Sequence, residues 1–433
     1  MLRLYTTYIV FIMSQKTDII ALIKQEVIPA IGCTEPIAVA LAVAKATETL
    51  ESTPEKITAR LSANIIKNAM GVGIPGTGMV GLPIAIALGA TIGRSEYQLE
   101  VLRDCTPKAV ENGKKIIEEG RINVELKETT EKLYIEIEVV GRGHIAIATI
   151  AGSHTNFVHI EKDGEVSLEK AFGGEVAGCS ADIKLDMRMV YDFAMQTPLD
   201  DIRFILEAQK LNDEVSRHSL GEKFGHTVGH TMSTSPELFG DTIYAKVVGR
   251  TAAAADARMA GCPMAVMSNS GSGNQGIACT MPVVAFADEI HATEEQRIRA
   301  LTLSHLTAIY IKQNLGRLSA LCGCVVASTG SACGITYLMG GSFDNISYAV
   351  KNMAATLTGM LCDGAKPSCA LKLATGVSTA LMCAKLAMNG KYVTSVEGIV
   401  ADSVDDSVRN MTDVGRDGMQ ETDKLVLKIM TNK

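Results

Sequence analysis

The sequence predicts an α+β fold, in which a mostly helical domain formed from the N- and C-terminal parts of the chain carries an inserted α+β domain. Apolar residues recur at helical spacing before residue 54 and again from about Leu168 onward. Between these regions several short segments alternate apolar and polar residues, as strands with one buried face do. The predicted helical domain comprises residues 14–54 and 167–433, and the inserted α+β domain comprises residues 55–166.

The N-terminus contains an apolar run, Leu4 to Met13, which is too short to span a bilayer. The run also lacks the small-residue cleavage site of a secretory signal. We therefore interpret residues 1–13 as disordered, or as the result of a start codon assigned too early, with the protein beginning at Met13. An ordinary N-terminal helix is the alternative.

The expected elements follow in order along the chain. Prolines at positions 29 and 36 divide the first helical region, Asp18 to Leu50, into two helices. In the inserted domain, a strand that starts at Ile57 leads into a glycine-rich turn between Gly71 and Gly78. The remaining predicted elements are helices at Leu82 to Leu88 and Pro107 to Glu119, and strands of an antiparallel meander at Ile122 to Leu126, Leu133 to Val139 and His144 to Ile150.

The C-terminal region is rich in Ala, Met, Leu and Gly, and the whole chain has nine Phe, ten Tyr and no Trp. Small side chains allow helices to approach closely. This composition therefore predicts a compact domain of buried, nearly apolar helices.

Overall composition restricts the class of protein. The 433 residues are 47% hydrophobic and 21% charged, as is typical of a globular chain. The formal net charge is −7 and no Lys/Arg-rich run occurs, which argues against nucleic acid as a partner, because phosphate binding needs clustered basic side chains. We expect a small-molecule partner and no membrane partner. The sequence leaves the oligomeric state open, with a homodimer as one option.

The cysteines predict a metallocofactor in a reducing compartment. Seven of the eleven fall between Cys262 and Cys369, and an odd count without a cleavable signal favours a cytoplasmic protein. Gly364 and Pro367 keep the segment between Cys362 and Cys369 in a loop, so that both sulfurs can reach one iron–sulfur cluster. Burial as small hydrophobic residues is the alternative for each cysteine. The candidates for a third ligand are Cys322 and Cys324, followed by Cys333 and Cys279.

A separate reactive thiol is predicted at Cys33, on a turn directly before an apolar helical run. The N-terminus of a helix lowers the pKa of a cysteine, which suits a base that removes a proton near neutral pH. Thr34 and Glu35 can cap the first turn. A negative Glu35 would instead raise the pKa of the thiol. A turn cysteine packed against a neighbouring helix, or a persulfide carrier, is the alternative role.

Two glycine-rich segments are candidates for binding a substrate carboxylate. In Ser268 to Gly276, short polar side chains and a flexible backbone can form a nest of N–H donors. In Asn64 to Gly78, Lys67 could pair with the carboxylate, although a solvent-exposed lysine is the alternative. The candidate substrate-binding residues in these segments are Lys67, Asn68, Ser268, Asn269, Ser270, Ser272, Asn274 and Gln275.

Four separated motifs carry a resemblance to a known family. They are Gly32-Cys33-Thr34-Glu35-Pro36, Ser268 to Gly276, Leu318 to Gly323 and Leu361 to Lys366. In this order they resemble the L-cysteine desulfidase family, also called UPF0597, which is related to the iron–sulfur L-serine dehydratases. The resemblance covers essentially all of the chain after Met13.

The resemblance implies a [4Fe–4S] lyase that converts L-cysteine and water into pyruvate, ammonia and hydrogen sulfide without pyridoxal phosphate. It favours Cys322, at the end of the shared Leu318 run, as the ligand that joins Cys362 and Cys369. A cluster held by three cysteines leaves one iron open as a Lewis acid. Because Ser153 to Asn156 resembles a dehydratase segment, His154 is placed near the site. The alternatives are action on L-serine or another β-substituted amino acid, and a noncatalytic iron–sulfur sensor.

Overall fold

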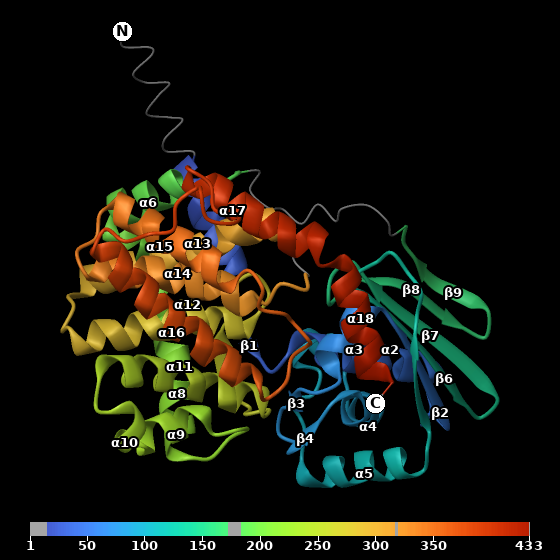
Figure 1. The fold of residues 1–433 in the computed structure, drawn as a ribbon. Coiled ribbons are helices and arrows are strands. Elements are labelled where there is room, and N and C mark those ends of the chain that lie inside the picture. Colours follow the sequence, from blue (N-terminus) through green and yellow to red (C-terminus); the bar gives the residue numbers. More distant parts are fainter. Residues whose placement is uncertain (1–14, 172–182, 317–318, 433) are drawn as a thin grey trace.

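The structure is a computed structural model that describes residues 15–171, 183–316 and 319–432. The interpretation of residues 1–13 therefore lies outside the described residues. The molecule has two parts side by side, a helical body and a part built around a six-stranded sheet (Figure 1). The predicted class, a mostly helical α+β fold, is confirmed.

The sheet has the strand order β5-β2-β6-β7-β8-β9. Its strands are β2 (Lys56–Leu61), β5 (Ile122–Leu126), β6 (Tyr134–Gly141), β7 (His144–Ala151), β8 (Phe157–Lys162) and β9 (Glu165–Glu169). The predicted meander is wrong for Ile122 to Leu126, because β5 pairs with β2 in parallel at the sheet edge. Parallel neighbours need a crossover connection, and here residues 62–121 supply it with helices. The antiparallel meander instead runs from β6 to β9.

Helices cover one face of this sheet. They are α2 (Thr34–Leu50), α3 (Ala63–Ala69), α4 (Leu82–Thr91) and α5 (Pro107–Glu118). The glycine-rich turn forms the small hairpin of β3 (Gly73–Ile74) and β4 (Met79–Val80), and a short 3-10 helix, η1, spans Ser95–Glu100. Along β6 the residues Ile135, Ile137 and Val139 are buried under the helices, as strict alternation requires.

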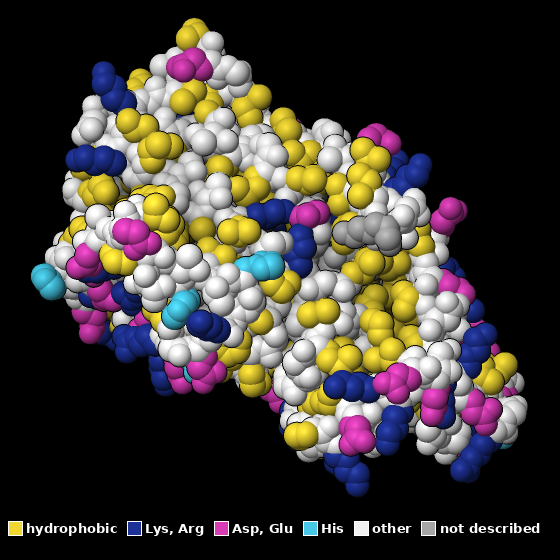
Figure 2. Space-filling model, turned by 60° about the horizontal axis from the view of Figure 1, so that its bottom comes forward, with side chains coloured by type: hydrophobic (Ala, Val, Ile, Leu, Met, Phe, Trp, Pro, Cys, Tyr) yellow, Lys and Arg dark blue, Asp and Glu magenta, His cyan; other side chains and the backbone are white. Residues whose placement is uncertain are grey.

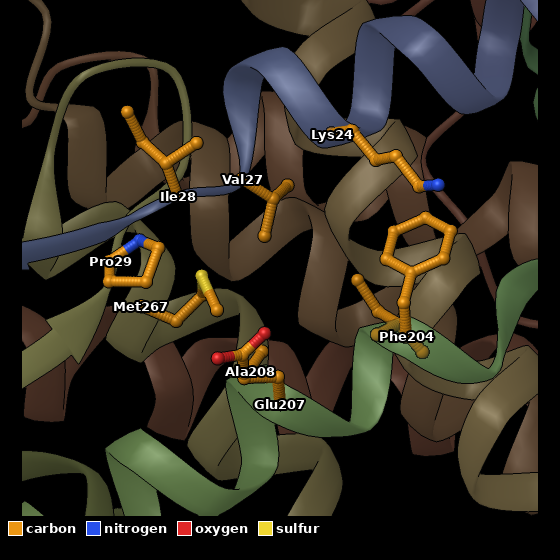
Figure 3. A pocket seen from close by; sticks show the side chains of 9 residues that line it. Lys24, Val27, Ile28, Pro29, Phe204, Glu207, Ala208 and Met267 are labelled. Atoms are coloured by element: carbon orange, nitrogen blue, oxygen red, sulfur yellow. The ribbon is translucent and has the colours of Figure 1, made fainter.

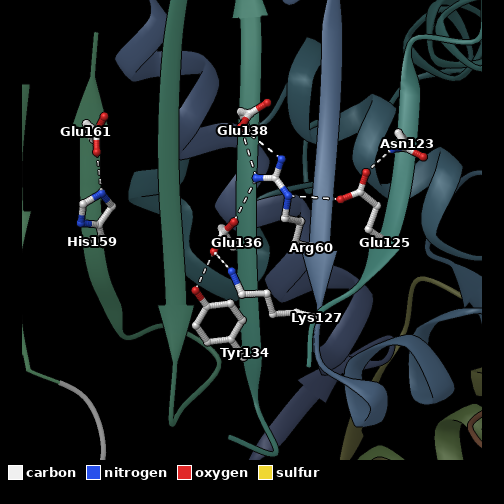
Figure 4. A network of polar contacts seen from close by, with 9 residues as sticks. All are labelled: Arg60, Asn123, Glu125, Lys127, Tyr134, Glu136, Glu138, His159 and Glu161. Atoms are coloured by element: carbon white, nitrogen blue, oxygen red, sulfur yellow. Dashed lines mark hydrogen bonds and ion pairs between the residues drawn. The ribbon is translucent and has the colours of Figure 1, made fainter. Parts of the chain in front are cut away.

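The opposite face of the sheet carries a charged network centred on Arg60 of β2 (Figure 4). Its guanidinium donates to Glu136 at 3.0 Å, to Glu138 at 3.2 Å and to Glu125 at 3.2 Å. These residues lie on three adjacent strands and are partly exposed. Exposed ion pairs contribute little to stability individually, so the network marks the solvent face of the sheet.

Helix α2 does not pack in the domain to which the sequence pattern assigns it. Sequence periodicity assigns residues 14–54 to the helical domain, whereas α2 shares a hydrophobic core with the sheet, in which Ile37 and Leu41 join Ile137. Nearly every position of α2 from Pro36 to Ala46 is buried. A helix that is apolar on all sides gives no indication of which core it will face.

The helical body surrounds a second and larger core. It comprises residues 15–26, α6 (Met187–Gln196), α7 (Leu199–Ile202), η2 (Arg203–Ile205), α8 (Leu206–Gly221), α9 (Val228–Thr234), α10 (Pro236–Phe239), α11 (Ile243–Met259), α12 (Gly273–Glu289), α13 (Glu294–Leu315), α14 (Gly323–Leu338), α15 (Phe343–Leu357), α16 (Cys369–Met388) and α17 (Val404–Asp413). Within the described chain α16 alone is long and apolar enough to cross a membrane, by length and composition. It packs against α11, α14 and α15, as a core helix does.

Within the described residues, two segments link the parts. The ribbon of β1 (Pro29–Ile31) and β10 (Ala265–Met267) carries Cys33 at one end. At the other end it carries residues 268–276, one of the two glycine-rich segments, which is also rich in serine and is called the serine-rich segment below. At the C-terminus, the π-helical turn η3 (Val414–Gly418) leads to α18 (Gln420–Thr431), which lies against α3 (Figure 1). On the molecular face in Figure 2, Lys and Arg side chains are interspersed with Asp and Glu rather than gathered in one basic patch.

Candidate functional site

A cavity of about 150 Å³ lies where the two parts meet, between α2, α3, α12, α14 and the loop before α16. Its walls come from segments that are far apart in the sequence. The predicted site residues that line it are Cys33, Lys67, Asn68, Ser270, Ser272, Asn274, Gln275, Cys322, Cys362 and Cys369.

A second cavity, of about 270 Å³, lies between residues 24–29, the start of α8 and Met267 (Figure 3). Its walls are mainly apolar, and the Lys24 ammonium lies 5.0 Å from the centre of the Phe204 ring. None of the predicted site residues lines it. The smaller cavity is therefore the candidate active site, because it gathers the nucleophilic and titratable side chains.

Backbone pairing brings Cys322 and Cys362 together. An isolated antiparallel bridge joins Leu321 to Leu361. On either side of it, the Cys322 N–H donates to the Met360 carbonyl at 3.0 Å and the Cys362 N–H donates to the Ala320 carbonyl at 2.7 Å. The loops that carry Cys322 and Cys362 are separated in the sequence by two helices, and this backbone pairing places them side by side.

Asp363 fixes the loop between Cys362 and Cys369. Its carboxylate pairs with Lys366 and Lys372, and the Lys372 ammonium also donates to the Leu361 carbonyl at 2.7 Å. Gly364 has a φ of +89°, and a Cβ there would lie 2.0 Å from the Lys67 carbonyl oxygen. Only glycine allows this loop to pass so close to α3.

A hydrogen bond and nearby positive charges favour a thiolate at Cys322. Its pKa is lowered to about 7, chiefly by a hydrogen bond from Cys324 and further by the positive charges of Lys372 and Lys366. Cys324 lies in the first turn of α14, and this shared hydrogen bond raises its own pKa. Burial raises the pKa of Cys362 and of Cys369.

The donor set can be tested against an iron–sulfur cluster. In the described part of the chain, no three His, Cys, Asp or Glu side chains are grouped so as to hold a single metal ion. Each cysteine of a cluster binds a different iron atom, so its sulfur ligands stand farther apart than those of one ion. Four thiols on one wall beside two lysines suit such an anionic cluster. Cys279 and Cys333 are buried within helices, away from this wall.

Cys33 occupies the predicted position at the N-terminus of α2 but is not a thiolate there. It is 5% exposed, and its thiol donates to the Glu35 carboxylate at 3.0 Å. Burial first and the Glu35 charge second raise its pKa, while the Arg258 charge lowers it. The expectation that the helix N-terminus lowers the pKa of Cys33 is therefore wrong, because desolvation opposes the charged form more strongly.

Lys67 lies in α3 and is 3% exposed, so the alternative of a solvent-exposed lysine is wrong. Its ammonium pairs with the Asp423 carboxylate of α18. The C-terminal helix thus supplies a counter-charge at the edge of the cavity, and Asn68 follows Lys67 on the lining.

Some residues of the serine-rich segment line the cavity, and others lie behind its wall. Ser272 caps α12 by accepting the Gln275 N–H at 3.4 Å, and it lines the cavity. Ser268 and Asn269 instead lie behind the wall, where the Ser268 hydroxyl donates to the Ile28 carbonyl at 2.7 Å. His154 lies in the turn between β7 and β8 and is not part of the lining.

Arg258 is a site residue that sequence reasoning missed. It is 6% exposed and donates to the Gly32 carbonyl at 3.0 Å and to Asn274 Oδ1 at 3.2 Å. Among the described residues no carboxylate forms an ion pair with it, and its Nε has no hydrogen-bond partner. An arginine in the alanine-rich run Thr251 to Met259 is the sequence signal that could have identified it.

Comparisons with known proteins agree with the motifs. A UPF0597 protein of Bacteroides fragilis (strain YCH46) is 60% identical over 97% of this chain and 99% of its own length. Similar proteins of Phocaeicola vulgatus and Porphyromonas gingivalis are 61% and 52% identical, each over 97% of this chain and over 98% and 99% of their own lengths. Residues 96–428 match the family described as the serine dehydratase alpha chain. The chain thus belongs to the UPF0597 proteins of the serine dehydratase alpha-chain family.

Proposed function

We propose that this protein is a [4Fe–4S]-dependent L-cysteine desulfidase, which eliminates hydrogen sulfide from L-cysteine to give pyruvate and ammonia. The observation that carries the proposal is the convergence of five cysteines and one buried arginine on a single cavity. The family supports a lyase of the dehydratase type. The choice of L-cysteine as substrate and of the cluster as cofactor is our inference.

Arg258 is the proposed partner of the substrate carboxylate. Its guanidinium is buried beside the cavity and forms no ion pair with a carboxylate of the described residues, and its Nε lacks an acceptor. Arginine binds carboxylates through paired hydrogen bonds. The first turn of α12 lies alongside, where the N–H groups of Gly273 and Asn274 have no partner within the helix and favour an anion.

Cys322, Cys362 and Cys369 are the proposed cluster ligands, with Cys324 as the alternative to Cys322. When bound, a cluster with three protein thiolates supplies an open iron that acts as a Lewis acid toward the substrate sulfur. Lys366 and Lys372 offset the negative charge of the thiolates. All the cysteines in the described residues are free, which suits the reducing cytoplasm that we propose as the location of the protein.

Cys33 is the proposed proton-transfer residue. Its thiol proton points to the Glu35 carboxylate, so Glu35 can receive that proton while the Cys33 sulfur removes the proton from the substrate Cα. This pairing keeps Cys33 neutral until substrate arrives. Lys67 and Asn68 line the same cavity and are proposed to orient the substrate.

L-Serine is the alternative substrate, and the name of the matched family favours it. The same residues would bind its carboxylate and ammonium, and its hydroxyl would replace the thiol. A thiolate is the softer ligand and the better leaving group, which is why we favour L-cysteine. A noncatalytic sensor is a weaker candidate, because it does not need the carboxylate-binding group at Arg258.

A substrate panel tests the proposal. Protein prepared without oxygen is expected to release equal amounts of sulfide and pyruvate from L-cysteine, and to act on L-serine with a lower kcat/KM. Both products are measured in one reaction. Pyruvate from L-serine with no sulfide from L-cysteine would establish the dehydratase instead.

The variant Arg258→Lys tests whether Arg258 binds the substrate carboxylate. Lysine keeps the charge but loses the paired geometry, so KM for L-cysteine should rise about tenfold or more, as expected for lost hydrogen bonds to a charged group. The iron content should stay unchanged, because Arg258 is not a proposed ligand. An unchanged KM would exclude Arg258 as the carboxylate partner.

A further inference from the structure

A chain of buried hydrogen bonds runs from the helical core to Ser270 on the cavity wall. Its members come from α8, α12 and α13 and from the serine-rich segment. The side chains behind the wall are at most 1% exposed, so each of their hydrogen bonds is made within the protein. These members are Asn212, Thr280, His305 and Asn269. Because every donor there needs an acceptor, the direction of each bond can be assigned from heavy atoms alone.

The contacts of Asn212 determine which atom donates in the first hydrogen bond of the chain. Its Oδ1 accepts the Met267 N–H at 2.8 Å, so its Nδ2 must be the atom that donates to the Thr280 hydroxyl oxygen at 3.1 Å. The Thr280 hydroxyl has one proton, which it donates to the Gly276 carbonyl at 2.7 Å. Toward any third neighbour Thr280 can therefore only accept.

That third neighbour is His305, whose Nε2 lies 2.9 Å from the Thr280 oxygen. The proton of the imidazole must then be on Nε2, which leaves Nδ1 as an acceptor. Burial lowers the pKa of His305 to about 3, so the ring is neutral at physiological pH. The tautomer follows from the hydrogen bonds on both sides of the ring.

Asn269 receives its orientation from the same histidine. Its Nδ2 donates to His305 Nδ1 at 3.1 Å and to the His305 carbonyl at 3.1 Å. Both partners are acceptors, so the amide cannot be turned around. Its Oδ1 consequently faces the Ser270 hydroxyl, at 2.8 Å. Because Oδ1 can only accept, the single proton of Ser270 is committed to Asn269.

We propose that Ser270 Oγ presents only lone pairs to the cavity and is the acceptor for the α-ammonium group of an amino-acid substrate. The inference rests on the proposed function for the choice of ligand. Asn269 and His305 are then positioning residues that prevent Ser270 from donating to a carboxylate. With Arg258 as the donor, the cavity would hold a zwitterion in one orientation.

The backbone of Ser270 supports this assignment. Its φ of +48° is rare for a residue with a side chain, and its N–H donates to the Glu26 carbonyl at 2.9 Å. A strained conformation persists where the surroundings hold it. The contact to Glu26 and the bond to Asn269 together aim the Ser270 hydroxyl.

Two ligands that differ by the ammonium group test the proposal. L-Alanine carries both charges and has no leaving group, whereas propionate carries only the carboxylate. We expect calorimetric titration of the anaerobically prepared holoprotein to show that Ser270→Ala weakens L-alanine binding about tenfold, the loss typical of a hydrogen bond to a charged group. Propionate binding should change less than about twofold. Ser270→Gly, which relieves the positive φ, should give the same pattern and excludes a folding defect as its cause.

Ser272→Ala is the matched control. The Ser272 oxygen accepts the Gln275 N–H and keeps its own proton available for an anion. Loss of the Ser272 hydroxyl should therefore weaken the binding of L-alanine and of propionate alike. If Ser270→Ala weakens the binding of both ligands equally, or the binding of neither, Ser270 is not the ammonium acceptor. Wild-type protein that releases sulfide without preferring L-alanine over propionate would overturn this inference alone. Wild-type protein that binds neither ligand and turns over no amino acid would overturn the proposed function as well.

Discussion

Replacing Cys322 by alanine is expected to abolish the iron–sulfur absorption of anaerobically prepared protein, and with it the release of sulfide. Cys322 has a lowered pKa, lies beside two lysines and is paired through the backbone with the Cys362 loop. A cluster cannot be retained by the remaining ligands if one of three thiolates is lost. Absorption, iron content and circular dichroism measured on one preparation separate loss of the cluster from loss of fold.

Two further variants complete this experiment. Cys333→Ala removes a thiol that is buried in α14 away from the cavity, so it should keep the full absorption. Cys324→Ala decides between the two neighbouring thiols, because it should retain the cluster if Cys322 is the ligand. A full cluster in both Cys322→Ala and Cys362→Ala would contradict the proposed ligand set.

Replacing Cys33 by serine is expected to preserve the cluster absorption and to remove most of the sulfide release. The serine hydroxyl can keep the hydrogen bond to Glu35 and fills a similar volume, but it is a much weaker acid than a thiol and cannot take up the same proton-transfer role. L-Cysteine should still perturb the absorption spectrum, because substrate binding does not need the base.

Cys105→Ser is the matched control for Cys33→Ser. Cys105 is partly buried in the sheet-containing part and does not line the cavity, so this variant should keep both cluster and activity. Loss of iron from Cys33→Ser would make Cys33 a ligand. The cluster would then have four protein thiolates, and an open iron would no longer explain the elimination.

Local sequence pattern predicted much of the fold but not its long-range packing. Strand β5 was predicted with the residues Ile122 to Leu126 that it has, since alternation is local. Its parallel partner β2 was missed, because pairing across a helical crossover leaves no local pattern. Sequence periodicity places helix α2 in the helical domain, whereas it packs in the core of the sheet, because a helix buried on all sides does not indicate its neighbours.

The candidate site was likewise predicted only in part, because some of its features depend on packing between distant segments. Motif chemistry identified Cys33, Cys322 and Cys362, and the structure brings them to one cavity. The state of Cys33 could not be read from the sequence, because desolvation depends on surrounding residues from other segments. Arg258 was missed since a single charge in an alanine-rich helix resembles a surface residue. The family resemblance places His154 near the site, whereas His154 lies outside the cavity lining.

The most direct test of the proposed site is the response of the bound cofactor to L-cysteine. Protein prepared without oxygen should contain about four iron and four acid-labile sulfide per chain, as expected for a [4Fe–4S] cluster. Adding L-cysteine should change the absorption spectrum of the cluster before pyruvate accumulates, because the substrate sulfur is proposed to bind an iron that no protein thiolate occupies. A protein that contains no iron and still releases sulfide from L-cysteine would contradict the proposal.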